Sequence, residues 1–137
     1  ASSNNWDSRG MIHIHSSSGD VVSRFLPEAG LTRCLPVNWK GDGEEFLLMA
    51  ADTLIGGLVD WRGNPAVEFP SDGHPDACYL AQDLTGDARD EIVVWDADQL
   101  WIYTQDDNPR MGNTYAPRRN PAHSFSMHRM NRSLPGW

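Results

Sequence analysis

The feature that most constrains the fold of this chain is an internal repeat of about 44 residues. Matching residues recur at this offset, and two loops that open on Asn38 and Asp83 lie 45 residues apart. The pairs separated by 44 residues are Cys34 with Cys78, Gly19 with Gly63, and Phe25 with Phe69. Self-similarity with a period of about 20–50 residues is typical of repeat architectures, so one supersecondary unit is expected to recur along the chain.

The segments that recur have the composition of short β-strands. Runs such as "EFLLMA" and "EIVVW" are rich in β-branched and aromatic residues and are bounded by Gly, Asp, Asn and Pro. No stretch of a dozen residues keeps a 3.6-residue period. The sequence therefore predicts an all-β protein. Four short strands in about 40–50 residues form the unit of a β-propeller blade, and a small two-sheet sandwich is the alternative architecture.

The propeller interpretation divides the chain into blades of four-stranded antiparallel sheet. Residues 11–25 supply the outer strands of one blade, 34–69 a complete blade, 77–105 the last blade with an acidic loop, and 106–137 a C-terminal extension. Within that extension, residues 122–128 are a candidate outer strand. A closed ring takes typically about 4–8 blades and this chain supplies about two and a half to three. It is therefore expected to be part of a larger propeller, with further blades from the same parent protein or from another chain.

Charge and apolar patterning exclude several classes of partner. The net charge is −8, from 11 Lys and Arg against 19 Asp and Glu, which argues against nucleic-acid binding and against an anionic membrane surface. No apolar run approaches the roughly 18 residues of a membrane span. Cys34 and Cys78 are too few for a disulfide framework, and two thiols are favoured over one bridge because strands of neighbouring blades stand far apart.

The acidic loop "DLTGDARDE" carries oxygen-bearing groups at alternate positions. Positions 1, 3, 5 and 9 supply side-chain oxygens, from Asp83, Thr85, Asp87 and Glu91. Position 7 is Arg89, which is expected to supply its carbonyl while its side chain points away. Six to eight hard oxygen ligands are what Ca²⁺ requires. The sequence predicts a structural calcium site, although Ala88 stands where such loops usually have Gly. The alternative is an acidic turn held by Asx hydrogen bonds without a metal.

The earlier copy of this loop, "NWKGDGEEF", is altered. Asn38, Lys40, Asp42 and Phe46 occupy the matching positions, and Phe46 cannot ligate a cation. We expect Lys40 to pair with Asp42 and to replace the metal in this copy. A solvated lysine at a turn is the alternative.

The segments "DLTGDARDEIVVWDADQLWIYTQ" and "NWKGDGEEFLLMAAD", together with the repeat, resemble the FG-GAP-like calcium-loop β-propellers. The run to "LWIYTQ" and the closing "NRSLPGW" are similar to the C-terminal blades of bacterial rhamnogalacturonan lyases, polysaccharide lyase family 11. The resemblance covers residues 34–137. The calcium loop is also shared with integrin α-subunits and bacterial surface proteins, so it indicates the fold better than the activity.

The lyase resemblance implies a secreted or periplasmic enzyme that cleaves uronate-containing, rhamnogalacturonan-type glycan by β-elimination. That reaction needs a neutralised uronate carboxylate, a base for the C5 proton, and help for the leaving oxygen. The catalytic site is expected to lie only partly within this chain. The alternative function is a non-catalytic propeller module that binds carbohydrate or protein.

A few residues are weak candidates for these roles. His74 precedes a predicted innermost strand and could act as base or sugar ligand, and Arg62 is the second weak candidate for a catalytic role. Arginines can clamp a uronate bidentately and tryptophans can stack on sugar rings, which gives the substrate-binding candidates Arg33, Trp61, His74 and Asp76. The competing interpretations are a loop histidine without a task, solvated turn arginines, and tryptophans buried between sheets. His13 and His15 share one face of a strand, and no third transition-metal ligand is evident beside them.

Overall fold

The computed structural model describes residues 2–3, 11–26, 34–54, 56–76, 78–105 and 114–117. These residues form ten strands and contain no helix, which confirms the all-β prediction. The strands make three antiparallel sheets that follow one another in chain order. Within the described part of the chain there is no helix long and apolar enough to cross a membrane. Arg33 and the candidate strand 122–128 lie outside the described residues.

The first sheet has the order β1-β2-β3. Its strands are β1 (Ser2–Ser3), β2 (Ile12–His15) and β3 (Val21–Phe25). A tight turn joins β2 to β3, and Gly19 adopts a φ of 93° there, a left-handed conformation that glycine reaches without steric cost. Ile12 lies opposite Phe25 and His13 lies opposite Arg24, so these two pairs occupy opposite faces of the sheet.

The second sheet has four strands in chain order. They are β4 (Leu35–Val37), β5 (Phe46–Ala50), β6 (Gly57–Val59) and β7 (Pro65–Val67). Four consecutive residues of β5, Phe46 to Met49, are all buried. Because side chains alternate between faces along a strand, a continuous buried run means that both faces of this sheet are covered.

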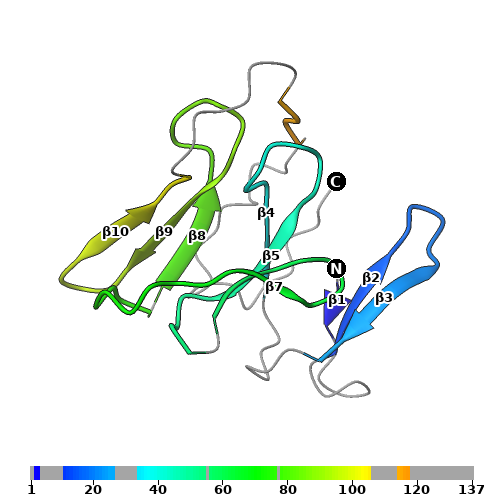
Figure 1. Ribbon diagram of the computed structural model, residues 1–137, viewed down its shortest axis with the longest axis horizontal. Coiled ribbons are helices and arrows are strands. Elements are labelled where there is room, and N and C mark those ends of the chain that lie inside the picture. The colour runs from blue at the N-terminus through cyan, green and yellow to red at the C-terminus, as the bar shows by residue number, and fades with distance from the viewer. Residues whose placement is uncertain are drawn as a thin grey trace.

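The third sheet has the order β10-β9-β8. It contains β8 (Cys78–Gln82), β9 (Glu91–Trp95) and β10 (Leu100–Tyr103). Figure 1 shows the second sheet in the middle, with the first sheet on one side of it and the third sheet on the other. The strands β4 and β8, which open the second and third sheets, lie next to each other.

Two apolar clusters hold the three sheets together. Phe46 and Leu48 of β5 share the larger cluster with Ile92 and Val94 of β9, between the second and third sheets. The smaller cluster, between the first and second sheets, contains Ile12, Leu47 and Met49 with Ile14, Phe25, Cys34 and Val59. The backbone also approaches closely there, because a Cβ at Gly63 would lie 2.5 Å from Cγ of Phe25. The second sheet therefore positions both of its neighbours.

Candidate functional site

The predicted metal loop joins β8 to β9 and curls around the carboxylate of Asp83. Oδ1 of Asp83 accepts a hydrogen bond from the amide of Gly86 at 2.6 Å, and Oδ2 accepts one from the amide of Ala88 at 3.0 Å. Ala88 adopts a φ of 74°, a left-handed conformation that costs a residue with a Cβ roughly 1–2 kcal/mol. The curl expected from the sequence is therefore present, and Ala88 occupies a position at which glycine would be unstrained.

Glu91, at the end of the loop, turns back toward its beginning. Oε2 of this buried carboxylate accepts a hydrogen bond from the amide of Leu84 at 2.6 Å. Oε1 accepts a hydrogen bond from the hydroxyl group of Thr85 at 3.2 Å. The side chain is thus neutralised in part by donors from its own loop, which is how a buried carboxylate avoids an uncompensated desolvation cost.

Asp87 is paired with the side chain of Arg89. Oδ2 of Asp87 accepts hydrogen bonds from Nε and Nη2 of Arg89 at 3.0 and 2.8 Å, and Oδ1 accepts the Arg89 amide at 2.8 Å. These hydrogen bonds, led by those from the guanidinium, hold the pKa of Asp87 below its usual value. The expectation that the Arg89 side chain points away is wrong. The buried guanidinium needs an acceptor, and the carboxylate of Asp87 supplies one.

The carboxylates of the acidic loop are engaged in hydrogen bonds in this arrangement. Among the residues that the structure describes, no three or more His, Cys, Asp or Glu side chains gather around a common point. The guanidinium of Arg89 occupies the charge-neutralising role at Asp87 that the sequence assigned to Ca²⁺. Coordination of a cation by Asp83, Thr85, Asp87 and Glu91 would require Arg89 to leave Asp87.

The altered loop between β4 and β5 is held by different contacts from those expected. Nζ of Lys40 lies 3.5 Å from Oε2 of Glu44 and 4.7 Å from the ring centroid of Phe46. Asp42 accepts the amide of Glu44 at 3.0 Å and so closes the turn. The predicted pair between Lys40 and Asp42 is thus replaced by a pair between Lys40 and Glu44, because Asp42 is engaged by the backbone.

The two loops are joined by a reciprocal exchange between Asn38 and Asp90. The amide of Asn38 donates to Oδ2 of Asp90 at 2.7 Å, and the amide of Asp90 donates to the carbonyl of Asn38 at 2.9 Å. The fully buried side-chain amide of Asn38 also donates to the carbonyls of Ala88 and of Tyr115, the latter at 2.8 Å. We call this set of contacts the Asn38–Asp90 junction.

Residues 114–117 pack against this junction. The amide of Tyr115 donates to the carbonyl of Gly41 at 2.9 Å. A Cβ at Gly41 would lie 2.6 Å from Cγ2 of Thr114 and 3.0 Å from Cγ of Arg89, so only glycine allows this approach. Sequence reasoning missed the junction, because Asn38 was considered only as a counterpart of Asp83 and Asp90 was not considered at all.

A second polar cluster lies around His74, in the linker from β7 to β8. The Nδ1 atom lies 2.6 Å from Oδ1 of Asp72, and the Nε2 atom lies 2.6 Å from the carbonyl oxygen of Ala51. Both partners are acceptors, so both ring nitrogens must carry a proton, which makes the ring an imidazolium. The side chain is only 1% exposed. In this arrangement neither nitrogen is free to take a proton from a substrate.

Several groups stabilise this buried cation. Burial opposes the charge, but the hydrogen bonds to the Ala51 carbonyl and the Asp72 carboxylate outweigh it and raise the pKa of His74, with a smaller contribution from Asp76. The hydroxyl of Tyr103 donates to Oδ2 of Asp72 at 2.8 Å. Burial and this carboxylate raise the pKa of Tyr103. The ring of His74 also contacts the aromatic rings of Phe69, Trp101 and Tyr103. The cluster thereby ties the linker to the second and third sheets.

The remaining sequence candidates are dispersed. Trp61 and Arg62 lie exposed at the turn between β6 and β7, with Cζ of Arg62 4.2 Å from the centroid of the Trp61 ring. Asp76 is exposed in the linker. Cys34 and Cys78 are both free thiols, and burial raises the pKa of Cys34. The structure brings together the residues of the acidic loop, whereas the turn pair and the His74 cluster occupy separate places along the chain.

Comparisons with known proteins leave the family open. No family model, no curated protein and no solved structure matches this chain. The resemblance to calcium-loop propellers and to rhamnogalacturonan lyases therefore stays a prediction from sequence motifs.

The calcium prediction can be tested by thermal unfolding. If Ca²⁺ displaces Arg89 and binds the loop, added Ca²⁺ should raise the melting temperature of the wild-type chain, and Asp87→Ala should abolish that response. Identical melting curves with Ca²⁺ and with chelator would exclude a calcium site in this loop and leave Arg89 as the group that neutralises Asp87. Under chelator, Arg89→Gln should lower the free energy of unfolding by about 1.5–3 kcal/mol, since it removes hydrogen bonds to a charged group.

The His74 cluster predicts a specific dependence of stability on pH. Because the pKa of His74 is raised in the folded chain, its contribution is complete below the unfolded pKa of about 6.5 and is lost as pH rises through the folded pKa. Hydrogen bonds from His74 and Tyr103 outweigh burial and lower the pKa of Asp72, so its contribution is lost only as pH falls through that lowered value. The melting temperature of the wild type should therefore fall more steeply above neutral pH than that of His74→Gln. Parallel profiles for the two proteins would contradict the imidazolium assignment.

Proposed function

We propose that residues 11–105 are consecutive blades of a β-propeller and that they act as a non-catalytic, carbohydrate-binding module. The loops after β4 and β8 have equal length, so Phe46 corresponds to Glu91 and Leu48 to Val93. Phe46 and Leu48 face the third sheet. Their counterparts Glu91 and Val93 lie on the opposite side of β9 from Ile92 and Val94, and so face away from the second sheet.

The same correspondence holds on the other face of each sheet. Ile92 and Val94, which contact the second sheet, correspond to Leu47 and Met49, which contact the first. The second sheet therefore contacts the first, and the third contacts the second, through side chains at equivalent positions of β5 and β9. Rotational stacking of repeated sheets has this property, whereas a two-sheet sandwich with a two-fold relation would bring equivalent faces together. The adjacency of β4 and β8 further supports radial stacking, because first strands of propeller blades converge on the axis.

The outward face of the third sheet suits a further blade. Val93 contributes to this face, and Leu100 and Ile102 are 61% and 50% exposed beside it. The equivalent face of the second sheet is covered by the third sheet. Val93 is already buried at 7% exposure, but a continuation of the stack by the same parent protein or by another chain would also bury Leu100 and Ile102. Such burial is favourable by about 25 cal/mol per Å² of apolar surface.

The observation that favours a non-catalytic role is the state of the two catalytic candidates. Both ring nitrogens of His74 are engaged, and the guanidinium of Arg62 lies over Trp61. His74 is therefore not free to act as a base toward a uronate. The exposed planar pair of Trp61 and Arg62 offers a surface on which a sugar ring can lie. Lyase activity stays a prediction for a protein that completes the site.

This proposal is tested by combining a lyase assay with a binding measurement. The chain is mixed with uronate polysaccharides, the ultraviolet absorbance of an unsaturated uronate product is followed, and binding is measured by calorimetry. We expect binding without product, weakened at least about tenfold by Trp61→Ala, since stacked aromatic side chains contribute strongly to recognition. Leu54→Ala, at an exposed turn, is the control and should bind as the wild type does. Product formation would establish the lyase interpretation. If neither product nor binding is detected, both proposals fail and a scaffolding role remains.

A further inference from the structure

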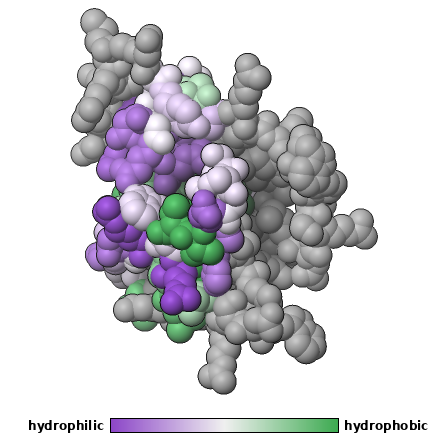
Figure 2. Space-filling view, turned by 90° about the vertical axis from the view of Figure 1, so that its right-hand side faces the viewer, coloured by the Kyte–Doolittle hydropathy of each residue, from purple (hydrophilic) through white to green (hydrophobic). Residues whose placement is uncertain are grey.

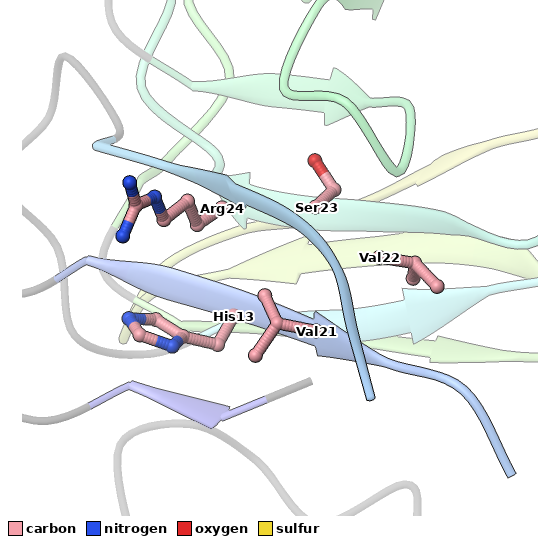
Figure 3. Close-up of a pocket in the computed structure, with 5 residues that line it drawn as sticks. All are labelled: His13, Val21, Val22, Ser23 and Arg24. Atoms are coloured by element: carbon pink, nitrogen blue, oxygen red, sulfur yellow. The ribbon is translucent and has the colours of Figure 1, made fainter. Parts of the chain in front are cut away.

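A hollow of about 480 Å³ lies on the first sheet, away from the acidic loop. It is lined by residues of β2 and β3, namely His13, Val21, Val22, Ser23 and Arg24. Figure 3 shows the side chains of His13 and Arg24 reaching in the same direction along neighbouring strands. Their Cα atoms are register partners, so both side chains stand on one face of the sheet.

The two basic residues in this hollow have polar side-chain atoms without partners among the described residues. The Nε2 atom of His13 is buried and has no hydrogen-bond partner among the described residues. The ring of His13 lies nearly parallel to that of His15, with the centroids 6.2 Å apart. Arg24 makes no ion pair with any other described residue, although the chain carries a net charge of −8. Arg24 is exposed, so water can solvate its guanidinium, whereas a buried polar atom without a partner, as at Nε2 of His13, is costly unless a ligand satisfies it.

The character of this face separates it from the faces used for stacking. The opposite face of the first sheet carries Ile12, Ile14 and Phe25 and packs on the second sheet. Figure 2 looks onto the side of the molecule where β2 and β3 lie, and the coloured surface there is mostly hydrophilic around a small hydrophobic patch. Val21 and Val22 are each 52% exposed on β3. Donors beside an apolar edge suit a small polar ligand better than another sheet.

We propose that His13 and Arg24 form a binding site for the carboxylate group of a small ligand. The planar guanidinium of Arg24 can hold both carboxylate oxygens, and the Nε2–H of His13 supplies a further donor. Val21 and Val22 contact the apolar side of the ligand. The carboxylate can belong to an acidic sugar unit or to a small organic acid, and the site does not depend on the propeller assignment.

The test uses two pairs of probes that differ in the acidic group. Galacturonate is compared with galactose, and benzoate with benzamide, by following the ¹⁵N chemical shifts of the histidine side chains in the full chain. We expect at least one acid to shift the His13 signals while its neutral partner does not. Arg24→Gln should weaken that binding at least about tenfold, because it removes a hydrogen-bonded charge from the site. Lys40→Gln removes an exposed cation from the loop after β4, outside both proposed binding surfaces, and should leave binding unchanged.

Each outcome decides the proposal. A response to galacturonate alone assigns the site to acidic sugars, and a response to benzoate assigns it to small organic acids. Equal responses to acids and neutral partners, no response to either acid, or unchanged binding by Arg24→Gln would overturn it. The thermal unfolding of Arg24→Gln shows whether the variant folds, and the His13 shifts of the wild-type chain remain decisive if it does not. Galacturonate binding without polysaccharide binding would keep this site while refuting the proposed module function.

Discussion

The arrangement of the second and third sheets depends on the exchange of hydrogen bonds between Asn38 and Asp90. These residues are 52 positions apart in the chain and lie in the loops that follow the adjacent strands β4 and β8. Apolar packing between sheets is not directional, so it permits a range of angles. Reciprocal bonds in a buried site fix one angle, because any rotation leaves buried donors unpaired at a cost of about 1–3 kcal/mol each. The side chain of Asn38 extends the same constraint to Ala88 and to Tyr115.

In both the acidic loop and the cluster around His74, charged side chains are compensated by hydrogen-bond partners nearby. In the acidic loop the carboxylates of Asp83, Asp87 and Glu91 are each offset by donors of their own, from backbone amides, a hydroxyl and one guanidinium. The cluster around His74 places a positive ring between a carboxylate and a carbonyl. In each case a buried charged group is retained because it connects segments that apolar contacts alone would leave free to slide. By contrast, Nε2 of His13 is buried without a partner among the described residues and stands beside the exposed guanidinium of Arg24, which is why a ligand is proposed there.

Local patterns in the sequence predict the strands and the curl of the acidic loop. Short β-branched runs such as the one that forms β9 require an all-β chain, and alternate oxygen positions predict that the loop turns on itself around Asp83. Contacts between sheets could not be predicted in the same way. The pairing of Asn38 with Asp90 and the bond from His74 to Ala51 depend on the angle between sheets, which no local spacing encodes. The direction of Arg89 was mistaken because burial of its guanidinium is decided by tertiary packing.

The most direct test of the central role of the junction is native-state hydrogen exchange of individual backbone amides. If the junction fixes the second and third sheets relative to each other, the amides of Asn38 and Asp90 should exchange only through global unfolding. Their exchange free energies should then match those of core amides in β5 and β9. Exchange of Asn38 and Asp90 through local opening, at the rate of the exposed loop amide of Gly73, would show that the junction does not hold the two sheets together.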